Sequence, residues 1–207
     1  IWSSCNLGAS SPEEFGDYYA WGETETKEFY NLHNYKYCKG EPCTFTKYVT
    51  QEHAYSSSYN HTFYDNYTIL QAMDDAANAV LGGTWCIPSK DDWQELIDNC
   101  DFLHTTRKGI YGLEVISKIN GNSIFLPAAS LCSGTDESRE KPDPSKSNFY
   151  SGSYWSTSLF YENQLNDSNA WSFAFYESSL KSVVYLRNWG RAEGMPVRPI
   201  DKGYVFN

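Results

Sequence analysis

The sequence predicts an α+β fold, in which two helices pack on small antiparallel sheets that are connected by long loops. Helix signals occur in two segments, 71–81 and 89–100, and alternating apolar and polar residues predict strands in the C-terminal half. The stretch from 24 to 70 is polar, rich in tyrosine and poor in helix signals, which predicts a long loop. A chain of 207 residues can bury a substantial core, and we expect one domain over 1–207.

Both helices are predicted from the residues at their ends. The first is expected over 71–81, because acidic residues lie in its first half and two glycines follow Leu81. The second is expected to begin after Ser89, whose hydroxyl can accept a hydrogen bond from the first turn, and acidic residues follow soon after it. Its apolar face, at helical spacing, consists of Trp93, Leu96, Ile97 and Cys100.

The strands are predicted from alternation and from one hairpin signal. Residues 113–119 and 123–127 flank Asn120-Gly121, the strongest short hairpin signal in the chain. Farther on, 170–176 and, more weakly, 180–186 alternate between the two faces of a strand. In the first of these two strands, the face expected to point to the core consists of Trp171, Phe173 and Phe175.

The segment 149–200 holds twelve aromatic residues, with Ser, Asn, Asp, Glu, Lys and Arg between them. Any one of these rings can be a core residue, since aromatic residues favour strands. Rings and arginines at turns or on the outward phase are more informative, because Tyr, Trp and Arg dominate binding surfaces. We therefore predict a ligand-binding surface formed by Phe160, Tyr161, Trp171, Tyr176, Tyr185, Arg187, Asn188, Trp189 and Glu193. Trp171 and Tyr176 are alternatively core residues, whereas Trp189→Ala is expected to reduce binding with little change in melting temperature.

Other residues near the ends of loops are given structural roles. Arg191 and Arg198 are interpreted as structural, because a guanidinium on a closing strand can donate to several loop carbonyls. Cys38 and Cys43 enclose a Lys-Gly-Glu-Pro turn and can form a short disulfide, which favours an oxidising compartment. The sequence leaves the pairing of the other four cysteines open, and the absence of CxxC pairs disfavours structural zinc.

The composition and motifs disfavour several functional classes. The net charge is −10 with no basic run, which argues against nucleic acid and against an anionic membrane surface. Direct membrane insertion is not expected, because no apolar run approaches the roughly 20 residues of a membrane span. The spacing of His33, His53 and His61 matches no metal motif, and GxSxG, HExxH and P-loop motifs are absent. We therefore expect no catalytic residues, no cofactor and no bound metal.

Several short motifs follow one another along almost the whole chain. They are Trp2-Ser-Ser-Cys-Asn-Leu-Gly-Ala9, Glu13-Glu-Phe-Gly-Asp-Tyr-Tyr-Ala-Trp-Gly-Glu-Thr24, Asp74-Asp-Ala-Ala77, Gly82-Gly-Thr-Trp-Cys-Ile-Pro-Ser89, Trp93-Gln-Glu-Leu96, Asn122-Ser-Ile-Phe-Leu-Pro-Ala-Ala129, Tyr154-Trp-Ser-Thr157 and Arg191-Ala-Glu-Gly-Met-Pro-Val-Arg-Pro199. With these motifs, the sequence resembles the Fibrobacter succinogenes major paralogous domain family of Bacteroidetes surface proteins. In that family an apolar strand normally precedes the position of Trp2, so the resemblance implies a trimmed N-terminus.

The resemblance implies a C-type-lectin-like fold of the type shared with formylglycine-generating enzymes. It also implies a non-catalytic, adhesin-like or receptor-like domain, secreted or at the cell surface, with a protein or glycan ligand on another cell or host surface. Some relatives are variable proteins of diversity-generating retroelements, in which reverse transcription scrambles codons near the C-terminus, and the matching segment here is 154–198. Alternatives are an enzyme related to formylglycine-generating, sulfatase-modifying proteins, and a fimbrial-tip or phage receptor-binding module. Calcium-dependent sugar binding is not expected, because Lys141-Pro142-Asp143 lacks the required carboxylate and amide pattern.

Overall fold

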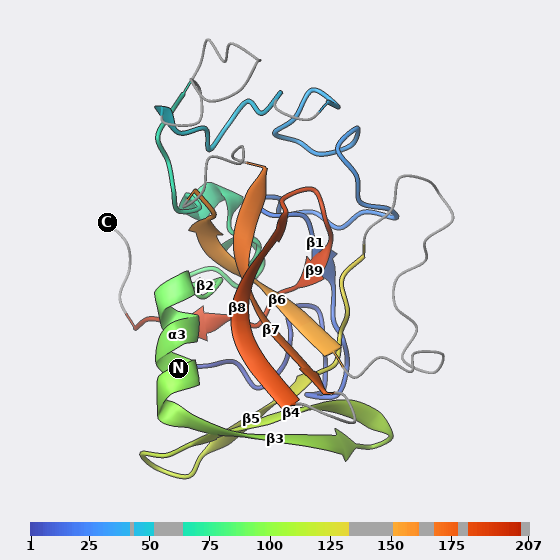
Figure 1. Cartoon of the computed structure of the whole chain (residues 1–207), viewed down its shortest axis with the longest axis vertical. Coiled ribbons are helices and arrows are strands. Elements are labelled where there is room, and N and C mark those ends of the chain that lie inside the picture. The colour runs from blue at the N-terminus through green and yellow to red at the C-terminus, as the bar shows by residue number, and fades with distance from the viewer. Residues whose placement is uncertain (42–43, 52–63, 133–150, 162–167, 178–181, 204–207) are drawn as a thin grey trace.

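The computed structural model describes residues 1–41, 44–51, 64–132, 151–161, 168–177 and 182–203 (Figure 1). Its helical elements are the 3-10 helix η1 (Ala72–Asp74) and the α-helices α2 (Ala76–Leu81) and α3 (Lys90–Asn99). Its strands are β1 (Tyr18–Tyr19), β2 (Trp85–Cys86), β3 (Cys100–Arg107), β4 (Ile110–Ser117), β5 (Ser123–Pro127), β6 (Ser151–Leu159), β7 (Asn169–Glu177), β8 (Ser182–Gly190), β9 (Met195–Pro196) and β10 (Ile200–Asp201). Helices combined with small antiparallel sheets confirm the predicted α+β class.

Two three-stranded antiparallel sheets, β3-β4-β5 and β6-β7-β8, form most of the described structure. The first contains the predicted hairpin, in which Ser117 N–H donates to the carbonyl of Asn122 at 2.9 Å. Two short antiparallel pairs, β1-β9 and β2-β10, join early and late parts of the chain. Trp2 also bridges to Ile200, so segments far apart in the sequence lie side by side near α3 (Figure 1).

α3 begins where the sequence predicts, and its N-terminus is capped by reciprocal hydrogen bonds. The Ser89 hydroxyl accepts from the Asp92 N–H at 3.1 Å, and the Asp92 carboxylate accepts from the Ser89 N–H at 2.7 Å. The helix expected over 71–81 is interrupted instead, because Asp75 is extended between η1 and α2. One oxygen of Asp75 caps α2 through the Asn78 N–H, and the other accepts from the N–H of the residue that follows β2.

The sheet β6-β7-β8 separates two clusters of buried hydrophobic residues. On one face α3 packs against it, and the Trp93 ring stacks on the Phe173 ring with centroids 4.5 Å apart. The second cluster contains Trp155 of β6 together with Trp21 and Tyr48 from the N-terminal quarter of the chain. The second cluster therefore covers the face of the sheet opposite α3. The alternation of apolar and polar residues did not predict that both faces are covered.

The middle of β7 is consequently buried on both faces of the sheet. Phe173 and Phe175 are buried, as the sequence predicts. Ala170, Ser172 and Ala174 on the opposite face are also buried, and Ala170 belongs to the second cluster. A central strand covered on both sides needs small residues wherever a neighbouring element approaches closely.

The tyrosine-rich stretch predicted as a loop supplies core residues. Tyr30, Tyr35 and Tyr48 are at most 2% exposed. The carboxylate of Asp74 accepts hydrogen bonds from the hydroxyls of Tyr37 and Tyr48 and from an adjacent lysine ammonium. Burial acts to raise the pKa of Asp74, but these hydrogen bonds outweigh it and lower the pKa. The buried carboxylate therefore anchors this stretch to η1.

Arg191 and Arg198 are structural, as predicted, and both are fully buried. Arg198 donates to the carbonyls of three residues and to the side-chain oxygen of Asn6, at 2.7 to 3.0 Å. Arg191 donates to the carbonyls of Lys47 and Tyr48, both at 3.1 Å. Each guanidinium therefore holds together segments that are distant in the sequence.

Of the two cysteines of the predicted Cys38–Cys43 disulfide, Cys43 lies outside the described residues. Cys38 is a free thiol that donates to the carbonyl of Glu41 at 3.2 Å. Cys86, one of the cysteines whose pairing the sequence leaves open, is also a free thiol and is buried in β2. Among the helices of the described residues, none is long and apolar enough to cross a membrane.

Candidate functional site

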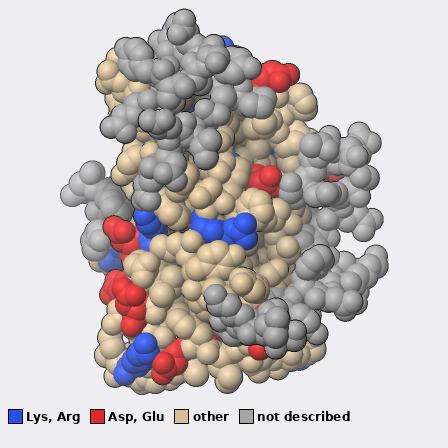
Figure 2. Space-filling model, viewed as in Figure 1, with Lys and Arg blue, Asp and Glu red and all other residues tan. Residues whose placement is uncertain are grey.

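β8 is the outer strand of its sheet, and it carries part of the predicted ligand-binding surface. Among the described residues β8 pairs only with β7, and the side chains from 183 to 190 are all partly exposed. Figure 1 shows β8 in the middle of the view, between α3 on one side and the β1-β9 pair on the other. Figure 2 shows basic side chains in the middle of the same face. β8 continues to Gly190, so Arg187 and Trp189 belong to a strand and not to a turn.

The alternation of β8 distributes the predicted residues over two faces of the sheet. Asn188 pairs with Trp171, and both side chains lie on the face of the sheet where Phe173 packs against α3. Tyr185, Arg187 and Trp189 lie on the other face, and each is paired with a small residue of β7, namely Ala174, Ser172 and Ala170 respectively. The nine predicted residues therefore do not form one continuous patch on a single face, because they flank an edge strand.

Four side chains on one face form a row, which we call the Arg187 row: Tyr176, Tyr185, Arg187 and Trp189. The guanidinium carbon of Arg187 lies 4.0 Å from the Trp189 ring centroid, and its Nη1 donates to the Tyr185 hydroxyl at 3.2 Å. The rings of Tyr176 and Tyr185 meet edge to face, with centroids 6.1 Å apart and an angle of 88° between their planes. The row therefore combines aromatic surface with one cation that its ring neighbours hold in place.

The opposite face carries a second, smaller aromatic group around Trp171. The ammonium nitrogen of Lys90 lies 4.0 Å from the centroid of the Trp171 ring, and the Phe160 ring meets the same indole edge-on at 4.9 Å. Nearby, the Asn169 side chain donates to the Asn188 side-chain oxygen at 2.7 Å. Lys90 is not among the contact residues predicted from the sequence, because only the packing of α3 brings the start of this helix to β7.

Three further predicted contact residues lie beyond the ends of β6 and β8. Phe160 is only 6% exposed, contrary to the expectation that it points outward, because it packs against Trp171. Tyr161 next to it is 44% exposed, as a contact residue requires. Glu193 follows the end of β8, where its N–H donates to the carbonyl of Gly190 at 3.0 Å and closes the turn.

Trp189 is more deeply placed than the sequence analysis predicts. It is partly buried and packs against the hydrophobic cluster that contains Trp155 and Trp21. Its indole Nε1–H is buried and has no hydrogen-bond acceptor among the described residues. The indole therefore contacts the Arg187 guanidinium and also packs against the hydrophobic core.

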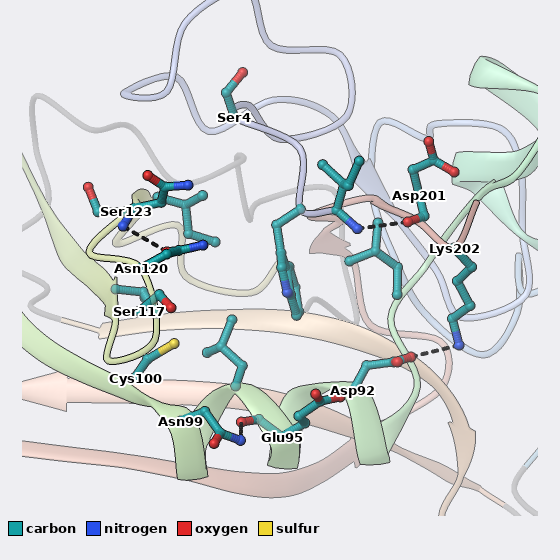
Figure 3. Close-up of a pocket in the computed structure, with 17 residues that line it drawn as sticks. Ser4, Asp92, Glu95, Asn99, Cys100, Ser117, Asn120, Ser123, Asp201 and Lys202 are labelled. Atoms are coloured by element: carbon teal, nitrogen blue, oxygen red, sulfur yellow. Dashed lines mark hydrogen bonds and ion pairs between the residues drawn. The ribbon is translucent and has the colours of Figure 1, made fainter.

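A groove of about 870 Å³ lies elsewhere, between α3, the turn joining β4 to β5, and both terminal segments (Figure 3). Its apolar lining includes Trp2, Leu96, Val115, Ile124 and Ile200. Asp92 and Glu95 of α3 lie along its rim, and Asp92 pairs with Lys202 at 2.9 Å. Sequence reasoning did not predict this groove, which forms where the N-terminal and C-terminal segments meet α3. No group of three or more side chains that can ligate a metal occurs in the described parts of the chain.

The described thiols with shifted pKa values are shifted away from reactivity. Burial raises the pKa of Cys86 to about 12, and burial also raises the pKa of Cys100. A nucleophilic or redox-active cysteine needs a lowered pKa and an accessible position. These two thiols therefore have the properties of structural cysteines.

Comparisons with models of protein families, with curated proteins and with solved structures give no match to this chain.

Proposed function

We propose that this chain is a non-catalytic ligand-binding domain that acts at a cell surface or after secretion. The observation that carries the proposal is the Arg187 row, a group of partly exposed rings and one guanidinium on an edge strand. Tyr, Trp and Arg give large, rigid contact area at low cost in conformational entropy, which is why they are enriched in binding hot spots.

The finer features of the proposal rest on the sequence resemblance. They are a C-type-lectin-like fold, membership in the Fibrobacter succinogenes major paralogous domain family, and diversification of the segment 154–198 by a retroelement. The two α-helices and the small antiparallel sheets that the resemblance implies are present. The ligand would be a protein or a glycan on another cell or on a host surface.

The enzyme alternative receives no support from the described thiols. Enzymes of the related fold oxidise a cysteine, and a mechanism that uses a thiol of this chain would need a reactive cysteine. The raised pKa of Cys86 and its burial in β2 oppose such a role.

The proposal is tested with a pair of double variants, each of which truncates two large, accessible side chains to alanine on a different sheet. The purified domain is applied to printed glycans and to immobilised mucin, fibronectin and collagen. In the surface variant, Tyr176→Ala is combined with Tyr185→Ala. In the control variant, Leu103→Ala is combined with Ile119→Ala, two positions that are 56% and 81% exposed on the β3-β4-β5 sheet and its turn.

We expect the wild type and the control to share a bound probe that the surface variant loses. Binding that the surface variant retains and the control loses would move the site to the other sheet and contradict the proposal. Circular dichroism of all three proteins checks that they are folded.

A further inference from the structure

Arg187 differs from most of the other partly buried cations among the described residues. Several of them are paired with carboxylates, as in Lys27–Glu23, Lys47–Asp74, Arg107–Glu114 and Lys202–Asp92. Arg187 forms no ion pair with any described residue, although the chain carries a net charge of −10. Its contacts are the Trp189 ring, the Tyr185 ring and one hydrogen bond to the Tyr185 hydroxyl.

The contacts of Arg187 also differ from those of the structural arginines. Arg191 and Arg198 are fully buried, and they donate to backbone carbonyls. Arg187 is partly exposed, and its one hydrogen bond is to a side-chain hydroxyl. A guanidinium has five N–H donors in a planar fork, so most of the donors of Arg187 are not used within the described structure.

The ring contacts prepare this guanidinium for a ligand. The Trp189 ring, whose centroid lies 4.0 Å from the guanidinium carbon, attracts the cation and excludes water from that side of it. The Tyr185 hydroxyl fixes the position of Nη1 at 3.2 Å. A guanidinium that is already oriented loses less side-chain entropy when a planar anion binds, and a carboxylate matches the fork with two parallel hydrogen bonds.

We propose that Arg187 binds the carboxylate of an acidic sugar, a uronic acid or a sialic acid, and that Tyr176 and Tyr185 contact the sugar ring. This inference rests on the proposed function and specifies its ligand. The two tyrosine rings are partly exposed and meet at 88°, so they present apolar surface and hydroxyl groups beside the cation. A single guanidinium matches a single carboxylate. A polyacidic peptide would bring several charges toward a protein of net charge −10, which disfavours it.

The experiment measures binding of the purified domain to four probes. They are a galacturonic acid oligosaccharide, the neutral galactose oligosaccharide, a sialic acid-terminated oligosaccharide and a hexaglutamate peptide. The proteins are the wild type, Arg187→Gln, Arg187→Lys and Lys108→Gln. The last variant removes the same charge from the turn between β3 and β4, where the Lys108 side chain is 74% exposed.

We expect at least one acidic oligosaccharide to bind and the galactose oligosaccharide to bind much more weakly. Arg187→Gln should weaken binding of the acidic sugar by about 10- to 100-fold, as loss of a charge-assisted hydrogen bond predicts. Arg187→Lys should weaken it by a smaller factor, because an ammonium keeps the charge and loses the bidentate geometry. Lys108→Gln should change the affinity less than twofold, and the two acidic oligosaccharides identify which sugar is the source of the carboxylate.

Three results would overturn the inference. They are equal binding of acidic and neutral sugars, an affinity that Arg187→Gln leaves unchanged, and binding of hexaglutamate alone. Each of these leaves the proposed binding function in place with another ligand. Absence of binding to all four probes also overturns the inference, and the screen with the Tyr176 and Tyr185 variant then decides the proposed function separately.

Discussion

Trp189 gives the sharpest test of how the candidate surface is built, because it contacts both the core and Arg187. Replacing a buried tryptophan with alanine costs about 3–5 kcal/mol, and partial burial reduces this to about 2 kcal/mol. Loss of the contact with the guanidinium at 4.0 Å adds about 0.5–1 kcal/mol. Trp189→Ala is therefore expected to lower the free energy of unfolding by about 2–3 kcal/mol. For a chain of this length, that corresponds to a melting temperature lower by about 5–10 °C.

The matched variant is Trp189→Phe, which keeps an aromatic ring under Arg187 and removes the indole N–H. That N–H has no acceptor among the described residues, so its removal breaks no hydrogen bond that the structure describes. We expect a loss of less than about 1 kcal/mol, because the smaller ring leaves only a limited cavity. Urea unfolding followed by circular dichroism measures both variants.

Two outcomes would refute this reasoning. An unchanged free energy of unfolding for Trp189→Ala would show that the indole is a surface residue, as the sequence analysis expects. A loss for Trp189→Phe equal to that for Trp189→Ala would show that the N–H has a partner, so that the indole is held by a hydrogen bond.

Three further predictions concern stability and diversification. Arg198→Met should lower the free energy of unfolding by about 3–5 kcal/mol in urea denaturation, because it leaves four acceptor oxygens without their donor, and the hydrogen bonds to Asn6 and Phe125 are buried. A loss below about 1 kcal/mol would contradict this structural role. Burial raises the pKa of Asp75 from 3.8 to about 6, so its protonated form is favoured in the folded state and its contribution to stability falls as pH rises from about 4 to 7. Asp75→Asn removes this dependence. The free energy of unfolding of the wild type, relative to that of the variant, should therefore decrease by on the order of 2–3 kcal/mol between these pH values, as measured by urea titrations. A difference that stays constant with pH would contradict the raised pKa. Sequencing around the gene should reveal a near-copy of the segment encoding 154–198 that differs mainly at adenines. The differences should fall at outward positions such as Tyr185 and Arg187 and not at buried Trp155. The absence of such a copy removes the retroelement from the proposal.

The parts of the fold that could be predicted from the sequence are those governed by local chemistry. Ser89 and Asp92 are close in the sequence and sufficient to set the start of α3 through their reciprocal hydrogen bonds. The Asn120-Gly121 turn likewise fixes the β4-β5 hairpin, with Gly121 at a φ of 73°. In both places the residues that decide the conformation lie within a few positions of the backbone they control.

Features that depend on distant partners could not be predicted. β6 has the sequence Ser-Gly-Ser-Tyr-Trp-Ser-Thr-Ser-Leu, and its polar residues include Ser156, which is fully buried, so no hydrophobic alternation marks it. Cys100 continues the apolar spacing of α3 but begins β3. The tyrosines of the stretch 24–70 become core residues through contacts such as the hydrogen bonds to Asp74. Lys90 reaches Trp171 only because α3 packs on β7.

The proposed site was likewise predicted only in part. Its residue types could be identified from the sequence, but their distribution over the two faces of the sheet depends on distant partners. Alternation specifies which side chains of β8 share a face, but it does not specify which face a second core will cover. Here both faces of the sheet are covered in the middle of β7, whereas the side chains of the edge strand β8 and those at the ends of β7 are partly exposed. The surface therefore follows the edge of the sheet, and neither face alone carries all the predicted residues.

An edge strand of this kind can change its outward residues without loss of the fold, because the main stabilising contacts lie elsewhere. Trp93 and Phe173 hold α3 against the sheet, and the fully buried guanidinium of Arg198 joins segments from both ends of the described chain. Tyr185 and Arg187 add partly exposed surface over small residues of β7, and their replacement leaves those contacts intact. Trp189 is the exception on this strand, because its indole also packs against the second hydrophobic cluster. A recognition surface that varies on this fold would therefore keep Trp189 and change the residues that precede it in β8.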